Sequence, residues 1–278
     1  MLTVTPRSGF VELTGRNRFN PIHTFECGQC FRWRPQADGS YLGVAFGQAA
    51  RIWEDGDHLC ISGTLDDYER VWRGYFDLDR DYEALDRLMP EVDILQQSLS
   101  FGRGLHILAQ EPWEALCTFI LSQCNNIPRI RTMTEALCSR FGEPVDYEGC
   151  TLYAFPSPER IAALSLDALA PIRAGYRSKY LLSAARRIVD GFDLDSLRQA
   201  DSKTAREQLL SFDGVGIKVA DCMLLFGLGK LDAFPVDTWI KKALFIYSEQ
   251  INPADFGNYA GIVQQYLFYY ARSMKIGK

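Results

Sequence analysis

A lysine that follows a glycine-rich turn is the residue best placed for nucleophilic chemistry. Residues 209–222 read LLSFDGVGIKVADC, and the apolar residues on both sides of Gly214 and Gly216 predict two helices joined by a tight turn. This pattern is typical of a helix-hairpin-helix, which we place at residues 204–227. Lys218 begins the second helix, where the positive end of the helix dipole disfavours a protonated amine. An unprotonated amine is a nucleophile, so Lys218 is a candidate catalytic residue.

Asp237 is the second candidate, in the stretch FPVDT at residues 234–238. An apolar helical pattern follows it, so Asp237 is expected to cap a helix. A carboxylate fixed there could also face Lys218 and stabilise a developing cation or relay a proton. Both roles are compatible, and we treat 234–238 as a catalytic aspartate loop.

The turn of the hairpin also suits a phosphate. Turn amides and the first helical N–H groups point outward together and form an anion-binding concavity, and Gly214 and Gly216 let a phosphate come close. For this fragment alone, a turn followed by an exposed lysine remains an alternative interpretation.

These motifs resemble those of a known family. LSFDGVGIKVADC at 210–222, followed by PVD at 235–237, is similar to the helix-hairpin-helix, Gly/Pro-Asp signature of DNA glycosylases, and KVADC is similar to the 8-oxoguanine DNA glycosylase branch. The resemblance covers nearly the whole chain, because it extends to GQCFRW at 28–33, NNIPR at 125–129, GYR at 175–177 and the stretch from Gln264 to Phe268.

The resemblance implies a bifunctional DNA glycosylase and AP lyase that acts on duplex DNA containing 8-oxoguanine. Such an enzyme extrudes the damaged nucleotide from the helix and holds it in a pocket. Lys218 would attack C1′, displace the base and form a Schiff base that permits β-elimination, while Asp237 would stabilise the cationic transition state. No cofactor is required for this chemistry, although a structural monovalent or divalent cation at the hairpin is expected as an option.

The resemblance also assigns a pocket for the extruded base. Gly28 matches the glycine whose carbonyl accepts a hydrogen bond from N7–H of 8-oxoguanine, whereas guanine presents a lone pair at N7. Gln264 would read the polar edge of the base and Phe268 would stack on its face. Cys222 would form the opposite wall, and Phe226 matches another pocket position.

Further positions match the DNA-contacting residues of the family, namely Asn125, Asn126, Arg129, Tyr176, Arg177, Gly214, Gly216, Val219 and Trp239. Three residues depart from the vertebrate pattern. Cys124 replaces the first of three asparagines, which fills the space left by the flipped base, Trp239 replaces a histidine and Phe226 replaces a methionine. Cysteine is smaller than asparagine, so reading of the opposite base by Arg129 and Arg177 is expected to be less selective.

The chain has 278 residues, 47% of them hydrophobic, and a formal net charge of −5. A net negative charge does not exclude DNA binding, because binding depends on where the charges lie. The interval 173–189 contains no acid and carries Arg173, Arg177, Lys179, Arg186 and Arg187. This interval suits a phosphate backbone, although a solvated helix face is an alternative.

We expect an α+β fold with two domains. Residues 1–102 predict an antiparallel sheet with a few helices, and the strands are expected at 29–34, 41–46, 50–54 and 58–62. Residues 103–278 predict a helical domain without a convincing strand. Helices are expected at 66–76, 93–99 and 113–124, after the capping residue Ser157 and after Gly175. By resemblance, the sheet domain is similar to the TATA-binding protein fold.

The eight cysteines are expected to be buried thiols, because no secretory segment is present. Cys27 and Cys30 have a spacing that suits a metal, but no second pair completes a zinc site. No apolar run reaches the roughly 18 residues of a membrane span. We therefore expect a monomer inside the cell, with the DNA, in a prokaryotic cytoplasm and nucleoid or in a nucleus.

Two alternative functions remain open from the sequence. A glycosylase for alkylated bases on the same scaffold would use an aspartate and water, so Lys218 argues against it. A non-catalytic helix-hairpin-helix DNA-binding protein would only grip phosphates, and Asp237 and the region of Gly28 would then have no explanation.

Overall fold

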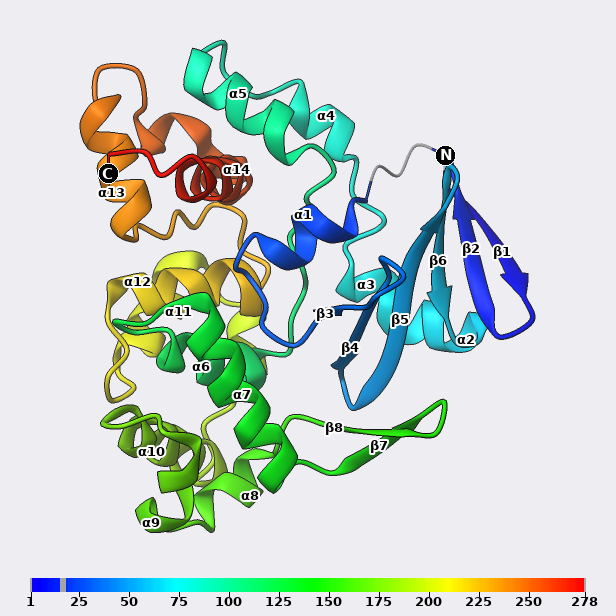
Figure 1. Ribbon diagram of the computed structural model, residues 1–278. Helices are drawn as coiled ribbons and strands as arrows, with labels where there is room; N and C mark the ends of the chain where they lie inside the picture. The colour runs from blue at the N-terminus through cyan, green and yellow to red at the C-terminus, as the bar shows by residue number, and fades with distance from the viewer. Residues whose placement is uncertain (1, 16–18, 278) are drawn as a thin grey trace.

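The computed structural model describes residues 2–15 and 19–277, and it consists of an antiparallel sheet beside a larger body of helices (Figure 1). The sheet has the strand order β1-β2-β6-β5-β4-β3, and each neighbouring pair is antiparallel. Its strands are β1 (Thr3–Arg7), β2 (Phe10–Thr14), β3 (Arg34–Pro35), β4 (Tyr41–Ala45), β5 (Gln48–Asp55) and β6 (His58–Ser62).

One continuous helical segment packs on the sheet. It comprises α2 (Leu65–Asp67), a π-helical stretch (Tyr68–Trp72) and α3 (Arg73–Tyr75), and it lies behind the strands in Figure 1. The helix predicted at 66–76 is thus confirmed. Alternate residues of the strands, such as Ile52 and Ile61, face a core that contains Trp33 and Trp72.

Three of the four predicted strands are confirmed as β4, β5 and β6, but the strand predicted at 29–34 is wrong. Of that stretch only Arg34 pairs with β4, together with Pro35, which follows it. The buried Gln29 side chain holds the backbone instead, because its Nε2 donates to the carbonyls of Thr24 (2.9 Å) and His106 (2.7 Å). The β1–β2 hairpin was not anticipated.

The body of the molecule is helical. Its helices are α1 (Pro21–Glu26), α4 (Tyr82–Asp86), α5 (Asp93–Gly102), α6 (Pro112–Leu121), α7 (Ile127–Phe141), α8 (Pro158–Ala162), α9 (Leu166–Leu169), α10 (Arg177–Val189), α11 (Ser202–Leu210), α12 (Ile217–Cys222), α13 (Thr238–Ile246) and α14 (Ala260–Ser273). The helices predicted at 93–99, after Ser157 and after Gly175 are confirmed, and Ser157 caps α8. The helix predicted at 113–124 ends earlier, at Leu121, because Cys124 takes a left-handed conformation (φ +46°).

A second hairpin corrects the expectation that no strand follows residue 102. Strands β7 (Pro144–Tyr147) and β8 (Cys150–Tyr153) pair with each other, and the hairpin reaches toward β5 (Figure 1). Both residues of its turn, Glu148 and Gly149, have positive φ, which gives the twist that a two-residue hairpin needs. Glu-Gly is a weak signal for such a turn, and this explains the error.

Two hydrophobic cores divide the molecule differently from the predicted boundary at residue 102. The smaller core lies between the sheet and its covering helix, while Tyr82, Ile94 and Leu99 belong to the larger helical core although they precede residue 102. All eight cysteines are free thiols, and only Cys124 and Cys150 are exposed. Among the described residues, no helix combines the length and apolar character that crossing a membrane demands.

Candidate active site

The helix-hairpin-helix is present as predicted, formed by α11, the turn 211–216 and α12. Gly214 has φ +76°, and a Cβ there would lie 2.3 Å from the ring of Tyr180, so this position requires glycine. A Cβ at Gly216 would meet no atom within 4 Å, so the second glycine faces open space. The turn is therefore supported on one side by α10 and open on the other.

Lys218 lies at the start of α12, and its amine contacts groups from α6 and from Ser122, the residue that follows α6. The Nζ atom donates to Ser122 Oγ at 3.2 Å, and this hydroxyl in turn donates to the Phe119 carbonyl at 2.8 Å. Nζ also lies 5.5 Å from the centroid of the Phe119 ring. Phe226 stacks on the Phe119 ring at 5.5 Å and supports the floor of the site, rather than presenting a free face.

Asp237 caps α13 as predicted, because its Oδ1 accepts a hydrogen bond from the Ile240 amide at 2.9 Å. Burial raises the pKa of its carboxyl, while the Ile240 amide and the charge of Lys218 act in the opposite direction. Burial also raises the pKa of the Cys222 thiol, and here too the Lys218 group opposes the effect. The fold thus brings Lys218, Asp237 and Cys222 into one electrostatic neighbourhood.

Helix α14 supplies the neighbouring wall. Gln264 is 3% exposed, its Nε2 donates to the Pro235 carbonyl at 3.0 Å, and its Oε1 is buried without a partner among the described residues. Gly28 has φ +89°, and a Cβ there would lie 3.3 Å from Phe268 Cε1 and 2.8 Å from Arg272 Nη1. Gly28, Gln264 and Phe268 therefore come together beside the aspartate loop, and an acceptor in this wall is unused.

The turn between α6 and α7 presents the residues expected to fill the gap in the DNA. Cys124 is exposed there, and Asn125 Nδ2 donates to the Leu121 carbonyl at 3.0 Å. Asn126 caps α7, because its Oδ1 accepts from the Arg129 amide at 3.0 Å. Both asparagines thus shape the turn, while the Arg129 side chain is exposed.

Arg177 is placed differently from the expectation of an available DNA-reading side chain. It is 5% exposed, and its guanidinium donates to the carbonyls of Gln123, Cys124 and Ala174. Arg187 of the same basic helix donates to Ser211 and lies over the Phe212 ring, so it supports the hairpin. Reading a base with Arg177 would require these hydrogen bonds to be released.

Comparisons with known proteins agree with this geometry. Residues 13–116 match the family model of the 8-oxoguanine DNA glycosylase N-terminal domain, and residues 117–249 match that of HhH-GPD superfamily base excision DNA repair proteins. A solved Clostridium acetobutylicum 8-oxoguanine glycosylase/lyase, in complex with double-stranded DNA containing cytosine opposite 8-oxoguanine, is 35% identical, with a TM-score of 0.94 and 99% of both chains covered. This chain belongs to the 8-oxoguanine DNA glycosylase family.

Two curated relatives are consistent with that assignment. The glycosylase is 39% identical over 153 residues to the N-glycosylase/DNA lyase of Saccharomyces cerevisiae, a match that covers 50% of this chain and 41% of the yeast protein. It is 29% identical over 301 residues to the N-glycosylase/DNA lyase OGG1 of Arabidopsis thaliana, covering 96% of this chain and 80% of the plant protein.

The remaining predicted DNA contacts of the glycosylase differ in exposure. Tyr176 is 47% exposed and its ring lies 4.6 Å from the guanidinium of Arg177. Trp239 is partly buried beside the Lys242 ammonium group. The Val219 side chain is 4% exposed and packs in the helical core, so only its backbone could reach DNA.

Four residues of the site were missed by sequence reasoning: Phe119, Ser122, Gln265 and Arg272. Arg272 follows Phe268 at the same spacing that separates Phe268 from Gln264, so helical periodicity alone could have indicated it. Ser122 and Gln265 carried no such signal, because their partners are distant in the sequence.

A metal site is not found among the described residues of the glycosylase, since no three His, Cys, Asp or Glu side chains gather there. Cys27 is fully buried and its Sγ donates to the Thr24 carbonyl. The hairpin cation stays a prediction.

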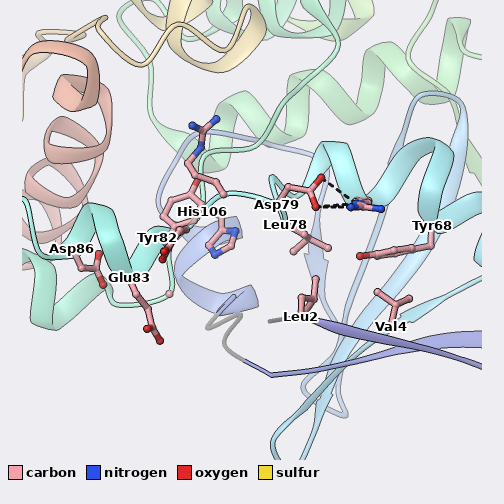
Figure 2. A pocket seen from close by; sticks show the side chains of 13 residues that line it. Leu2, Val4, Tyr68, Leu78, Asp79, Tyr82, Glu83, Asp86 and His106 are labelled. Atoms are coloured by element: carbon pink, nitrogen blue, oxygen red, sulfur yellow. Dashed lines mark hydrogen bonds and ion pairs between the residues drawn. The ribbon is translucent and has the colours of Figure 1, made fainter.

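A separate hollow of about 570 Å³ lies between the sheet and α4. Figure 2 shows Glu83 and Asp86 on one side of it, Leu2 and Val4 on the other, and His106 between them. Neither Lys218 nor Asp237 lines this hollow, so it is distinct from the active site.

Proposed function

We propose that this protein excises 8-oxoguanine from duplex DNA during base excision repair, and that Lys218 carries both the glycosylase and the lyase steps. The observation that carries the proposal is the joint placement of Lys218 and Asp237, one at the start of α12 and the other at the start of α13, where both side chains are partly buried. Because its proposed substrate is duplex DNA, we expect the protein to act in the compartment that holds the DNA of its cell.

In the first step, the neutral amine of Lys218 forms a bond to C1′ while the glycosidic bond breaks and its electron pair leaves with the base. Ser122 Oγ holds Nζ in place, and its own proton is committed to the Phe119 carbonyl, so the hydroxyl presents a lone pair to the amine. The carboxylate of Asp237 stabilises the positive charge that develops on the sugar.

In the second step, the ammonium formed on Nζ gives a proton to the departed base anion. The nitrogen lone pair then expels O4′, which takes a proton from water as the sugar opens to a protonated Schiff base. This iminium acidifies the proton at C2′, and its removal expels the 3′ phosphate by β-elimination. Water then releases Lys218. The reaction needs no oxidant, reductant or cofactor, because every bond change is a proton or electron-pair transfer.

The base pocket follows from the wall described above. Gly28 offers a carbonyl to the N7–H of the lesion, Gln264 Oε1 offers a buried acceptor, and Phe268 offers an aromatic face. A buried acceptor without a donor costs about 1–3 kcal/mol, and a base that supplies the donor recovers that cost.

Borohydride reduction in the presence of an 8-oxoguanine duplex tests the proposal. We expect a covalent protein–DNA adduct with the unmodified protein, and neither adduct nor base release with Lys218→Gln, which should still bind the duplex because the hairpin backbone is unchanged. Full base release by Lys218→Gln would indicate an aspartate-and-water mechanism, as in glycosylases for alkylated bases. Duplex binding by the unmodified protein without base release or adduct would indicate a non-catalytic DNA-binding protein.

A further inference from the structure

The turn that carries Gly28 is held by side chains from outside it. Arg272 Nη2 donates to the Glu26 carbonyl, and Gln265 Nε2 donates to the Cys27 carbonyl at 3.1 Å. On the other side of Gly28, Gln110 Nε2 donates to the Gln29 carbonyl at 2.8 Å. Gln110 and Gln265 are 4% and 1% exposed, so these hydrogen bonds are shielded from water.

The Gly28 carbonyl differs from its three neighbours. Within the described part of the chain, no hydrogen bond reaches it, although the carbonyls of residues 26, 27 and 29 each accept one from a side chain. Gly28 is partly exposed, so its carbonyl can be reached from outside the turn while the neighbouring carbonyls are already satisfied. The pattern leaves one acceptor available to a ligand in an otherwise satisfied turn.

These hydrogen bonds restrict how the Gly28 carbonyl can point. Each peptide unit is a rigid plane, so fixing the carbonyls before and after Gly28 limits its own plane to a small rotation. Glycine would otherwise allow a large rotation, since both signs of φ are accessible to it. Arg272 also covers the Cα of Gly28, where an added Cβ would lie 2.8 Å from its Nη1.

Arg272 links this turn to the stacking wall as well. Its guanidinium carbon lies 5.4 Å from the centroid of the Phe268 ring, and its Nη1 is buried without a partner among the described residues. An unpaired, buried N–H on a charged guanidinium lowers the stability of the fold. The contacts of Arg272 with Gly28 and Phe268 give a physical reason for an arginine at this position.

From these contacts we infer that Gln265 and Arg272 are positioning residues that set the discrimination between 8-oxoguanine and guanine. They hold the turn 26–29 so that the Gly28 carbonyl, the one carbonyl of this turn without a hydrogen bond in the described structure, faces the base beside the ring of Phe268. An incoming N7–H satisfies that acceptor, whereas the N7 lone pair of guanine is repelled by it. Without the two donors, the carbonyl can rotate away and the difference between the bases shrinks. The inference rests on the proposed function.

The test uses Gln265→Met, which keeps side-chain length, and Arg272→Met, which shortens the side chain but keeps its apolar stem. Both remove the donors. Tyr270→Phe is the matched control, because it removes a hydrogen bond of α14 to Gln97 on another face of the helix. In the Lys218→Gln background, the affinity for a duplex containing 8-oxoguanine is compared with that for the same duplex containing guanine. The ratio of the two affinities is the binding selectivity. With Lys218 present, single-turnover release of 8-oxoguanine reports on the pocket, and strand cleavage at an abasic site reports on Lys218 without the base.

We expect each methionine variant to lower both the selectivity ratio and the rate of 8-oxoguanine release by about tenfold, the equivalent of one lost hydrogen bond. Abasic-site cleavage should be unchanged in both, and Tyr270→Phe should match the unmodified protein in every assay. Arg272→Lys should retain most of the selectivity, since a lysine can still donate to the Glu26 carbonyl.

Unchanged selectivity in both methionine variants would overturn the inference, as would a parallel loss of abasic-site cleavage, which would indicate general damage to the fold. If Gln265→Met does not fold, the inference is tested by comparing Arg272→Met with Arg272→Lys. Residue 272 lies at the partly exposed end of α14, so substitutions there should be tolerated by the fold. If the unmodified protein releases no 8-oxoguanine, the proposed function fails; if it does and the variants behave like it, only the positioning role fails.

Discussion

At the scale of single residues, Asp237 has two tasks that place different demands on its carboxylate. Capping requires only an oxygen that accepts from the Ile240 amide, whereas stabilising a cation requires the negative charge. Burial raises the pKa of this carboxyl, and the charge of Lys218 opposes that shift. Protonated Lys218 therefore favours the ionised carboxylate in the resting enzyme, before the amine loses its proton and attacks C1′.

Asp237→Asn separates the two tasks. The amide oxygen of asparagine caps a helix about as well as aspartate, so the free energy of unfolding should change by less than about 1 kcal/mol. The rate of base release should fall by about two orders of magnitude or more, because a positioned charge is lost from a partly buried site. Denaturant unfolding and single-turnover excision measure the two quantities. An unchanged excision rate would show that Asp237 is structural only.

Cys124 gives a second prediction at this scale. Its φ of +46° is unusual for cysteine, whereas asparagine adopts left-handed conformations more readily. Asparagine also fills more of the gap left by a flipped base and can hydrogen-bond within it. We predict that the unmodified protein prefers cytosine over adenine opposite 8-oxoguanine only modestly, and that Cys124→Asn sharpens this preference by up to about tenfold without loss of stability.

The measurement is single-turnover excision from four duplexes that differ only in the base opposite the lesion. A preference for cytosine of several orders of magnitude in the unmodified protein would contradict the role given to residue 124. Arg129, together with Arg177 freed from its hydrogen bonds to backbone carbonyls, would then be enough to read the opposite base. Cys150→Asn is a suitable control, since Cys150 is also an exposed thiol but lies in the β7–β8 hairpin.

At the scale of elements, the hairpin depends on α10 for its shape. The Tyr180 ring packs against Gly214, Ser183 donates to Asp213, and Arg187 donates to Ser211. The charge pattern predicted that α10 contacts DNA, but one of its basic residues, Arg187, instead supports the hairpin turn. The open side of the turn, at Gly216, remains available to a phosphate.

The two glycines of the hairpin should therefore respond differently to alanine. Gly214→Ala forces a side chain into the Tyr180 ring at a positive φ, so we expect it to destabilise the fold by about 2 kcal/mol or more. Gly216→Ala meets no atom and should cost less than about 1 kcal/mol, but its methyl group would hinder a phosphate and weaken duplex binding. Thermal unfolding and duplex titration of both variants check this contrast. Equal stability of the two would contradict it.

At the scale of the whole molecule, His106 lies where the sheet and the helical body meet. It is 1% exposed, its ring stacks on Tyr82 at 3.8 Å, and its Nδ1 lies 3.0 Å from the Phe76 carbonyl. Burial lowers the pKa of His106 from 6.5 to about 4. The folded protein thus keeps this imidazole neutral at a pH where the unfolded chain would protonate it.

The pH dependence of stability follows from that difference. Between pH 6.5 and 4 the unfolded state binds a proton at His106 that the folded state does not, so stability falls as the pH falls. The contribution of neutral His106 to the free energy of unfolding is fully present above about pH 6.5. As the pH falls to 4, this contribution decreases by up to about 3 kcal/mol. His106→Gln keeps a donor for the Phe76 carbonyl and should remove this part of the slope. Urea unfolding from pH 4 to 7 measures it, and identical slopes would contradict the prediction.

The local features of this protein were determined by the sequence alone. A helix-hairpin-helix is recognisable because its turn needs glycine at a positive φ and its flanking helices need apolar residues at helical spacing, as at Gly214 and Val219. The positions of Lys218 in the first turn of one helix and of Asp237 as the cap of another were predictable for the same reason. These signals lie within a few residues of one another.

Only the tertiary structure decided how distant segments meet. The burial of Arg177 against the turn at 123–124, the hydroxyl of Ser122 beside Lys218, and the donors of α14 on the carbonyls of residues 26 and 27 each join segments far apart in the chain. No periodicity encodes such pairs, because a buried donor takes whichever acceptor the packing of helices brings to it. The β7–β8 hairpin escaped prediction for a related reason, since its short strands are defined by their pairing with each other and not by their composition.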